Sequence, residues 1–145
     1  MNRKKRLLPL LMALLLIVSY LPVMRSYAAG CIVRGDNHTP WNSVQDGVFT
    51  YDGGTMTITT SNGSLTGTAD NVTVPENTTV TVTVSPKEGY TVQLCLNGAQ
   101  VTLNNNVYKV VTSANQPEFK FEACFINPGG GNNPGNPNPP AGNQP

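Results

Sequence analysis

The feature that most constrains the fold is the strict alternation of threonine and valine in the segment TVTVTVS, residues 79–85. A period of two places every valine on one face of an extended strand and every threonine on the other. Both residue types are branched at Cβ, which favours the pleated surface of a sheet. One packed face and one wet face is typical of antiparallel sheets, so the segment predicts an antiparallel β-protein.

Further alternating segments and turn signals extend this prediction along the chain. TMTIT at 55–59 and FKFEACF at 119–125 alternate in the same way. Asn-Gly pairs at 62–63 and 97–98 each separate two short segments, and such a pair supplies the positive φ angles of a tight hairpin. No helical stripe follows the N-terminal segment. We therefore predict an all-β fold, a small antiparallel two-layer or β-grasp-like domain with short strands and Asn-Gly hairpins.

The N-terminal segment has the layout of an export signal. Four basic residues at positions 3–6 precede an apolar run over 7–23, and small residues follow up to Gly30. An uncleaved membrane anchor is the alternative, but the run is short for a spanning helix and contains two prolines. We predict a signal peptide over residues 1–28 and an extracellular or cell-surface location.

Two cleavage sites compete within this signal. A cut after Ala28 gives an ordinary secreted product, whereas a cut after Gly30 leaves Cys31 first, as in a bacterial lipoprotein whose cysteine carries a lipid. The fit to the lipoprotein pattern is partial, because Ala28 stands where that pattern usually has leucine. In both cases membrane contact is confined to the signal peptide or to a lipid on Cys31.

Removal of the signal changes the charge balance that matters for partners. Five of the nine basic residues lie before Ala28, so four basic and eight acidic residues remain, a net charge of −4. An acidic product with scattered lysines has no electrostatic footprint for nucleic acid and no basic helix for a membrane surface. The sequence therefore predicts no nucleic-acid partner.

Composition divides the remainder of the chain into three parts. Residues 31–46 are polar and show no period, which predicts an irregular lead-in. Residues 47–127 carry all of the alternating segments and form the predicted β-domain. Residues 128–145 contain only Pro, Gly and Asn with one Ala and one Gln. Such a segment has too little to bury to offset its ordering entropy, which predicts a disordered tail.

An ordered series of motifs within the predicted domain resembles the divergent internalin-type B-repeat of bacterial surface and secreted proteins. In that family a Thr/Val strand ends in a proline turn, a Gly-Tyr pair follows, and an alternating strand leads to an Asn-Gly turn. The corresponding segments here are residues 53–58, 79–86, 89–90, 91–96, 97–98, 108–110 and 119–125. The chain departs from the family in its cysteines and in its single copy. The resemblance implies an exported spacer or interaction module with a β-grasp-like sheet and no catalytic residues.

Residues that catalysis or metal binding would need are sparse. His38 is the single histidine and stands near Asp36 in the predicted lead-in. A metal site needs several ligands at fixed spacing, and a nucleophilic serine or cysteine needs an adjacent base. Phosphate-binding and dinucleotide-binding motifs are absent from the sequence. The sequence predicts a protein that is not an enzyme, with no catalytic residues, metal site or cofactor.

Two features of the predicted lead-in are speculative binding residues. Arg34, Gly35 and Asp36 spell the integrin-binding tripeptide, although three such common residues also meet by chance. Trp41 could stack on a sugar face, although a lone tryptophan near a small domain more often covers an open end of its core. The partner itself is unknown, and the two classes that these features suggest are a cell-wall glycan and a host surface protein.

The three cysteines are Cys31, Cys95 and Cys124. Export permits a disulfide, and an odd count leaves one cysteine over. Cys95 and Cys124 are both out of phase with the apolar residues of their segments, which places them on the wet faces of two strands. We predict that these strands are neighbours and carry a surface disulfide between Cys95 and Cys124, worth about 3–4 kcal/mol. Two free thiols are the alternative.

Overall fold

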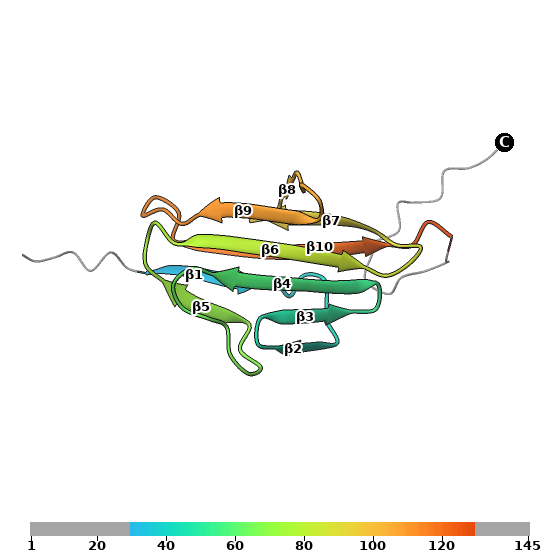
Figure 1. Cartoon of the computed structure of the whole chain (residues 1–145), viewed down its shortest axis with the longest axis horizontal. Coiled ribbons are helices and arrows are strands. Elements are labelled where there is room, and N and C mark those ends of the chain that lie inside the picture. Colours follow the sequence, from blue (N-terminus) through green and yellow to red (C-terminus); the bar gives the residue numbers. More distant parts are fainter. Residues whose placement is uncertain (1–29, 130–145) are drawn as a thin grey trace, which may run out of the picture.

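A computed structural model describes residues 30–129, which form a sandwich of two five-stranded sheets (Figure 1). No helix occurs within this range, so the all-β, two-layer prediction is confirmed. The predicted signal peptide and residues 130–145 of the predicted tail lie outside it. The strands are β1 (Cys31–Gly35), β2 (Ser43–Gln45), β3 (Val48–Tyr51), β4 (Gly54–Thr60), β5 (Asn71–Val74), β6 (Thr79–Pro86), β7 (Thr91–Leu96), β8 (Ala99–Val101), β9 (Val107–Val111) and β10 (Glu118–Ile126).

The strand order is β5-β1-β10-β7-β8 in one sheet, which we call sheet A, and β2-β3-β4-β6-β9 in the other, sheet B. Neighbouring strands run antiparallel except for β1 and β10, which are parallel and place Ile32 beside Glu118 and Gly35 beside Phe121. The first and last strands of the described chain thus lie side by side in the middle of sheet A.

The alternating segments form the strands that face the core. In β6 the side chains of Val80, Val82 and Val84 are buried while its threonines lie on the outer face of sheet B. In β10 the buried residues Phe119, Phe121, Ala123 and Phe125 alternate with half-buried ones. Burial of these side chains between the sheets supplies the main stabilising free energy, at about 1.5–3 kcal/mol for each large apolar side chain.

The prediction of an irregular lead-in over residues 31–46 is wrong, because β1 and β2 both lie within it. Cys31 and Val33 are buried in the core, and β1 forms ladders with β5 on one side and β10 on the other. A strand of five residues is too short for its alternation to stand out in the sequence, and its neighbours supply the stability. The β-domain therefore begins at Cys31 rather than at residue 47.

The close approach of the two sheets at β1 requires a glycine. A Cβ atom on Gly35 would overlap the ring of Phe49 in β3 and would lie 2.6 Å from its Cζ atom. Phe49 is fully buried, and the edge of the Trp41 ring packs against it at a centroid distance of 5.0 Å. Gly35 therefore makes room for an aromatic side chain of the facing sheet.

One of the two predicted Asn-Gly hairpins is correct. Asn97 and Gly98 have φ angles of 51° and 81° and join β7 to β8 in sheet A. The prediction for residues 62–63 is wrong, since β4 and β5 belong to different sheets and the connection is a loop over 61–70. This loop buries the side chain of Leu65, and that burial fixes its path between the sheets.

A buried hydroxyl group holds the turn between β5 and β6. Thr112 Oγ1 accepts a hydrogen bond from the backbone N–H of Thr78 at 2.9 Å and donates one to the carbonyl oxygen of Pro75 at 2.9 Å. Thr78 and Thr112 are the two buried polar residues of the core. Their hydrogen bonds replace the water that burial removes.

We expect Thr112→Val to lower the free energy of unfolding by about 1–3 kcal/mol, because the buried N–H of Thr78 loses its acceptor while the volume is unchanged. Urea titration of both proteins measures the loss. Thr55→Val, on the outer face of β4, is the matched control and should stay within about 0.5 kcal/mol of the parent chain. Equal losses in the two variants would contradict a structural role for the Thr112 hydroxyl.

Candidate functional site

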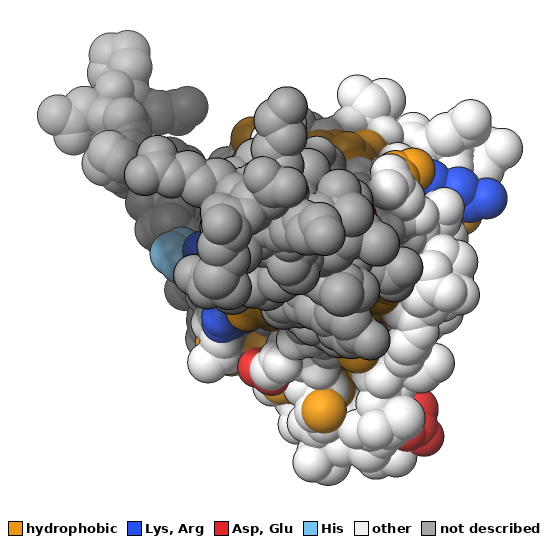
Figure 2. Space-filling view, turned by 90° about the vertical axis from the view of Figure 1, so that its left-hand side faces the viewer, with side chains coloured by type: hydrophobic (Ala, Val, Ile, Leu, Met, Phe, Trp, Pro, Cys, Tyr) orange, Lys and Arg blue, Asp and Glu red, His pale blue; other side chains and the backbone are white. Residues whose placement is uncertain are grey.

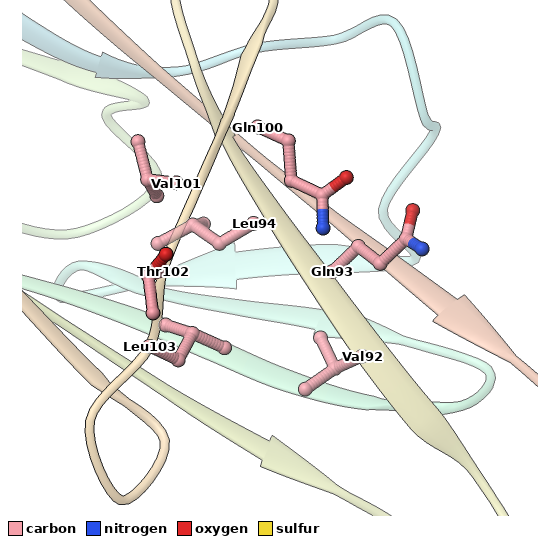
Figure 3. A pocket seen from close by; sticks show the side chains of 7 residues that line it. All are labelled: Val92, Gln93, Leu94, Gln100, Val101, Thr102 and Leu103. Atoms are coloured by element: carbon pink, nitrogen blue, oxygen red, sulfur yellow. The ribbon is translucent and has the colours of Figure 1, made fainter.

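A groove of about 480 Å³ lies where β8 separates from β7 (Figure 3). The ladder between these strands ends at the pair Leu94–Val101, and Thr102 and Leu103 then diverge from β7. Figure 3 shows Gln93 and Gln100 projecting to one side, away from Val101 and Leu103. The lining residues are Val92, Gln93, Leu94, Gln100, Val101, Thr102 and Leu103. The amide groups of Gln93 and Gln100 thus lie on the outer face of sheet A, and the apolar lining residues Val92, Leu94 and Val101 lie on the core-facing side.

A second groove, of about 460 Å³, lies farther along the same connection and is lined by Asn104, Asn105, Val107 and Lys109. The two grooves flank the connection between β8, the edge strand of sheet A, and β9, the edge strand of sheet B. We call this part of the molecule the β8–β9 side. It brings together amides, a hydroxyl group and one lysine.

The opposite side of the sandwich, between β2 and β5, is closed by the loop over residues 61–70. Its Leu65 side chain enters the core, and Gly67 exchanges two hydrogen bonds with Asp46, through its N–H to Oδ1 at 2.6 Å and through its carbonyl oxygen to the Asp46 N–H at 2.8 Å. Hydrogen bonds from Gln45 and from Gly67 lower the pKa of Asp46. The β8–β9 side, by contrast, leaves Val101, Leu103, Tyr108 and Val110 only partly buried.

Cys95 and Cys124 lie on neighbouring strands and on the same outer face of sheet A, as predicted. The predicted disulfide is absent, and both thiols are free. Cys95 lies opposite Glu122, and Cys124 lies opposite Gln93, so the two cysteines are diagonal neighbours offset by two residues. A diagonal pair has a Cα separation of about 7–8 Å, which exceeds the reach of an unstrained disulfide.

The surroundings of these two thiols raise their pKa values and so disfavour the thiolate form. Burial raises the pKa of Cys124, the hydroxyl group of Thr39 lowers it, and the carboxylate of Glu122 raises it again. Burial and Glu122 also raise the pKa of Cys95. Thr39 donates a hydrogen bond of 2.7 Å to Glu122, which holds the connection between β1 and β2 against sheet A at this point. Because the thiolate is the nucleophile, both groups are poor ones at neutral pH.

We expect iodoacetamide at pH 8 to modify Cys95 and Cys124 more slowly in the folded chain than in the urea-unfolded chain. Their raised pKa values leave less thiolate at that pH, and the rate should climb as the pH rises toward the folded-state pKa. Glu122→Gln should speed both reactions because it removes a negative charge that disfavours the thiolate. Glu118→Gln on the same strand is the control, and peptide mass spectrometry separates the sites. Equal rates in both variants would contradict the assignment to Glu122.

Cys31, the predicted lipidation candidate, is the first residue of β1 and its side chain is 1% exposed. Its thiol lies 3.5 Å from the carbonyl oxygen of Ser113. A lipid on this sulfur would require the first residue of β1 to leave the core. The geometry therefore supports Cys31 as a core residue and offers no room for the lipid in the folded domain.

The tripeptide Arg34-Gly35-Asp36 does not lie in the irregular lead-in that the sequence predicted. Arg34 and Gly35 lie in β1, and Asp36 donates its backbone N–H to the carbonyl oxygen of Phe121 at 2.8 Å. The Arg34 side chain forms an ion pair with Glu118 at 3.2 Å. Gly35 is buried beneath Phe49. The tripeptide therefore forms the end of a central strand and the residue that directly follows it, which corrects the prediction of an irregular lead-in.

Trp41 packs against the core rather than presenting a free face. Its ring meets Phe49 edge-on, with an interplanar angle of 74°, and it belongs to the partly buried residues around the core. This contact agrees with a tryptophan that covers an open end of the core. Trp41 and Gly35 therefore both pack against Phe49, and this contact gives both residues a structural role in the core.

Sequence reasoning missed the β7–β8 groove altogether. The one sequence feature that could have indicated the groove is the short segment AQVTL, which follows the Asn-Gly turn and precedes three asparagines at 104–106. A strand shorter than its hairpin partner leaves part of that partner unpaired, and here the shortfall opens the groove beside Val92 and Gln93. Only the structure shows where the divergence begins.

The described surface offers little charge for a ligand to recognise. Residues 30–129 carry four basic and eight acidic side chains, and those that are visible in Figure 2 are separated from one another. Within residues 30–129 no group of three or more His, Cys, Asp or Glu side chains could hold a metal ion. Among the same residues no helix is long and apolar enough to cross a membrane. The groove at β7 and β8 is therefore the candidate site that geometry favours.

No family model matches the sequence, and no curated protein or solved structure matches it at a significant level.

Proposed function

We propose that the chain is an exported, non-enzymatic surface or secreted module whose role is spacing, display or weak adhesion. The observation that supports this role is the placement of the first and last strands. β1 begins at one end of the sandwich and β10 ends at the other (Figure 1). β1 begins beside Pro117, the residue before β10. At a rise of about 3.3 Å per residue, the chain from Pro117 to Ile126 extends about 30 Å along the sheet.

This in-line placement suits a spacer. The first residue of β1 and the chain that follows Ile126 lie at opposite ends of the sandwich rather than at one end. The sequence adds the export signal and an acidic balance after its removal, both expected of a module outside the cell. The likeness of residues 53–127 to the B-repeat supports the same role.

The test is the fate of the full chain expressed in a Gram-positive host. Intact mass of the product shows whether residues 1–28 or 1–30 are removed, and labelling of whole cells with antibody shows whether the domain reaches the surface or the medium. We expect a cleaved product outside the cell. Leu15→Arg, which places a charge in the apolar run, is the control that should block export. An uncleaved chain retained in the cytoplasm would overturn the proposal.

A second candidate function rests on the groove at β7 and β8. The amides of Gln93 and Gln100 lie side by side on the outer face of sheet A, where they can bond to sugar hydroxyls. On this hypothesis the domain is a small carbohydrate-binding module. Trp41 does not contribute, since it packs on Phe49.

Calorimetric titration of the exported product with solubilised cell-wall glycan tests this second candidate. Binding should weaken in Gln100→Ala, and it should stay unchanged in Gln45→Ala, which alters an exposed glutamine at the far edge of sheet B. Absence of binding, or binding that both variants keep, removes the groove as a glycan site and leaves the spacer role standing.

A further inference from the structure

We propose that the domain resists mechanical force applied along its chain, because its terminal strands form a parallel pair that such force shears. The inference rests on the proposed spacer role and concerns load that enters the domain through its two terminal strands. It goes beyond that role, since a spacer can hold a distance without withstanding a pull. The geometry of β1 and β10 carries it.

Force on the chain reaches β1 at Cys31 and β10 at Ile126. Since the strands are parallel and these two residues lie at opposite ends, the pull slides one strand along the other. Every hydrogen bond of the ladder then carries the strain at once. Terminal strands whose loaded ends lay together would separate one bond at a time, and each bond would break alone.

The parallel ladder extends beyond the register pairs at both ends. Ile32 donates its N–H to the carbonyl oxygen of Pro117 at 2.8 Å, and Asp36 donates its N–H to the carbonyl oxygen of Phe121 at 2.8 Å. Between them, four register pairs run from Ile32–Glu118 to Gly35–Phe121. The residues that enter and leave β1 are therefore bonded to β10 as firmly as its centre.

Neither terminal strand is at an edge of its sheet. β5 pairs with β1 from Cys31 to Arg34, and β7 pairs with β10 from Phe121 to Ile126. Sliding β1 against β10 therefore disturbs a second ladder on each side as well. It also draws Val33 and Phe119, which are fully buried, out of their places in the core. Hydrogen bonding and core packing oppose the same movement.

The ion pair that bridges these strands contributes little by comparison. Arg34 and Glu118 are each 36% exposed at their side chains, and a pair of this kind is screened by water and salt. The ladder and the buried side chains, rather than the ion pair, supply the resistance. Arg34→Ala should therefore leave the unfolding force nearly unchanged.

Single-molecule force spectroscopy on the purified, folded mature protein (residues 29–145) tests the inference through the direction of pulling. In the first arrangement the chain is held by its two termini, which shears β1 against β10. In the second it is held at Glu88, in the exposed turn before β7, and at the C-terminus. That arrangement loads the pair Thr91–Ile126 first and peels β10 from β7 one pair at a time. Both arrangements use the same folded protein.

We expect the unfolding force to be several-fold higher in the first arrangement. Equal forces, or a lower force between the termini, would overturn the inference. The outcome of this test can be distinguished from failure of the proposed function. If the chain is exported but its unfolding force is not higher between the termini, only the mechanical inference is refuted. A resistant domain in a chain that is never exported refutes only the proposed function.

Discussion

Replacing Phe121 with alanine is expected to lower the free energy of unfolding by about 3–5 kcal/mol, the largest loss from any single truncation considered. The side chain is fully buried in the middle of β10, and its ring lies 6.4 Å from that of Tyr108 in the facing sheet. β1 on one side and β7 on the other hold the backbone there. The core around the vacated volume therefore relaxes only partly, and the cost of the cavity adds to the lost burial.

Equilibrium unfolding in urea, with the slope compared between proteins, measures this loss. Val111→Ala is the control, since that side chain in edge strand β9 is 54% exposed and its truncation should cost within about 0.5 kcal/mol. Phe121→Leu should lie between the two. A loss for Phe121→Ala as small as that of Val111→Ala would show that the ring does not occupy the core.

The second large effect is expected at the start of β4, where Gly54→Ala should cost about 3 kcal/mol. A Cβ atom there would overlap the carbonyl oxygen of Ser85, and it would lie 2.9 Å from the Cα atom of Pro86 and 2.5 Å from Cε1 of Phe125. Two of these obstacles are backbone atoms of the adjacent strand β6, so a change of side-chain rotamer cannot relieve the overlap. The strands must move apart at this point instead.

Gly129→Ala is the matched control for this substitution, because the nearest atom to its Cβ would be Asn127 Oδ1 at 3.8 Å. Thermal and urea unfolding of the two variants should differ clearly, with Gly129→Ala close to the parent chain. If Gly54→Ala kept the parent stability, β4 and β6 would have to lie farther apart than their register of Gly54 opposite Pro86 allows.

The strands of the core could be predicted because each carries its own pattern. Alternation in β6 and β10 identified the buried valines and phenylalanines individually, and the structure places all of them in the core. β1 could not be found in this way. Its segment contains an arginine and a glycine, and it is a strand because β5 and β10 bond to it on both sides, which no local pattern records.

The pairing of Cys95 and Cys124 could likewise be predicted only in part, because the sequence does not show the register between their strands. Their phase within each strand gave the correct face, and neighbouring strands were correctly expected. The offset between β7 and β10, however, depends on the whole path through β8 and β9 that separates them. A shift of two residues keeps both thiols on the same face and still puts Glu122, rather than Cys124, opposite Cys95.

The central position of β1 and β10 also governs when the chain can fold. Arg34 and Glu118, joined across this pair, are 84 residues apart in sequence, and contacts of such separation form slowly because a long loop must close first. A growing chain that has not reached β10 has no centre for sheet A and cannot bury β1. Completion of sheet A therefore waits for the last strand, although every strand of sheet B precedes β10 in the chain.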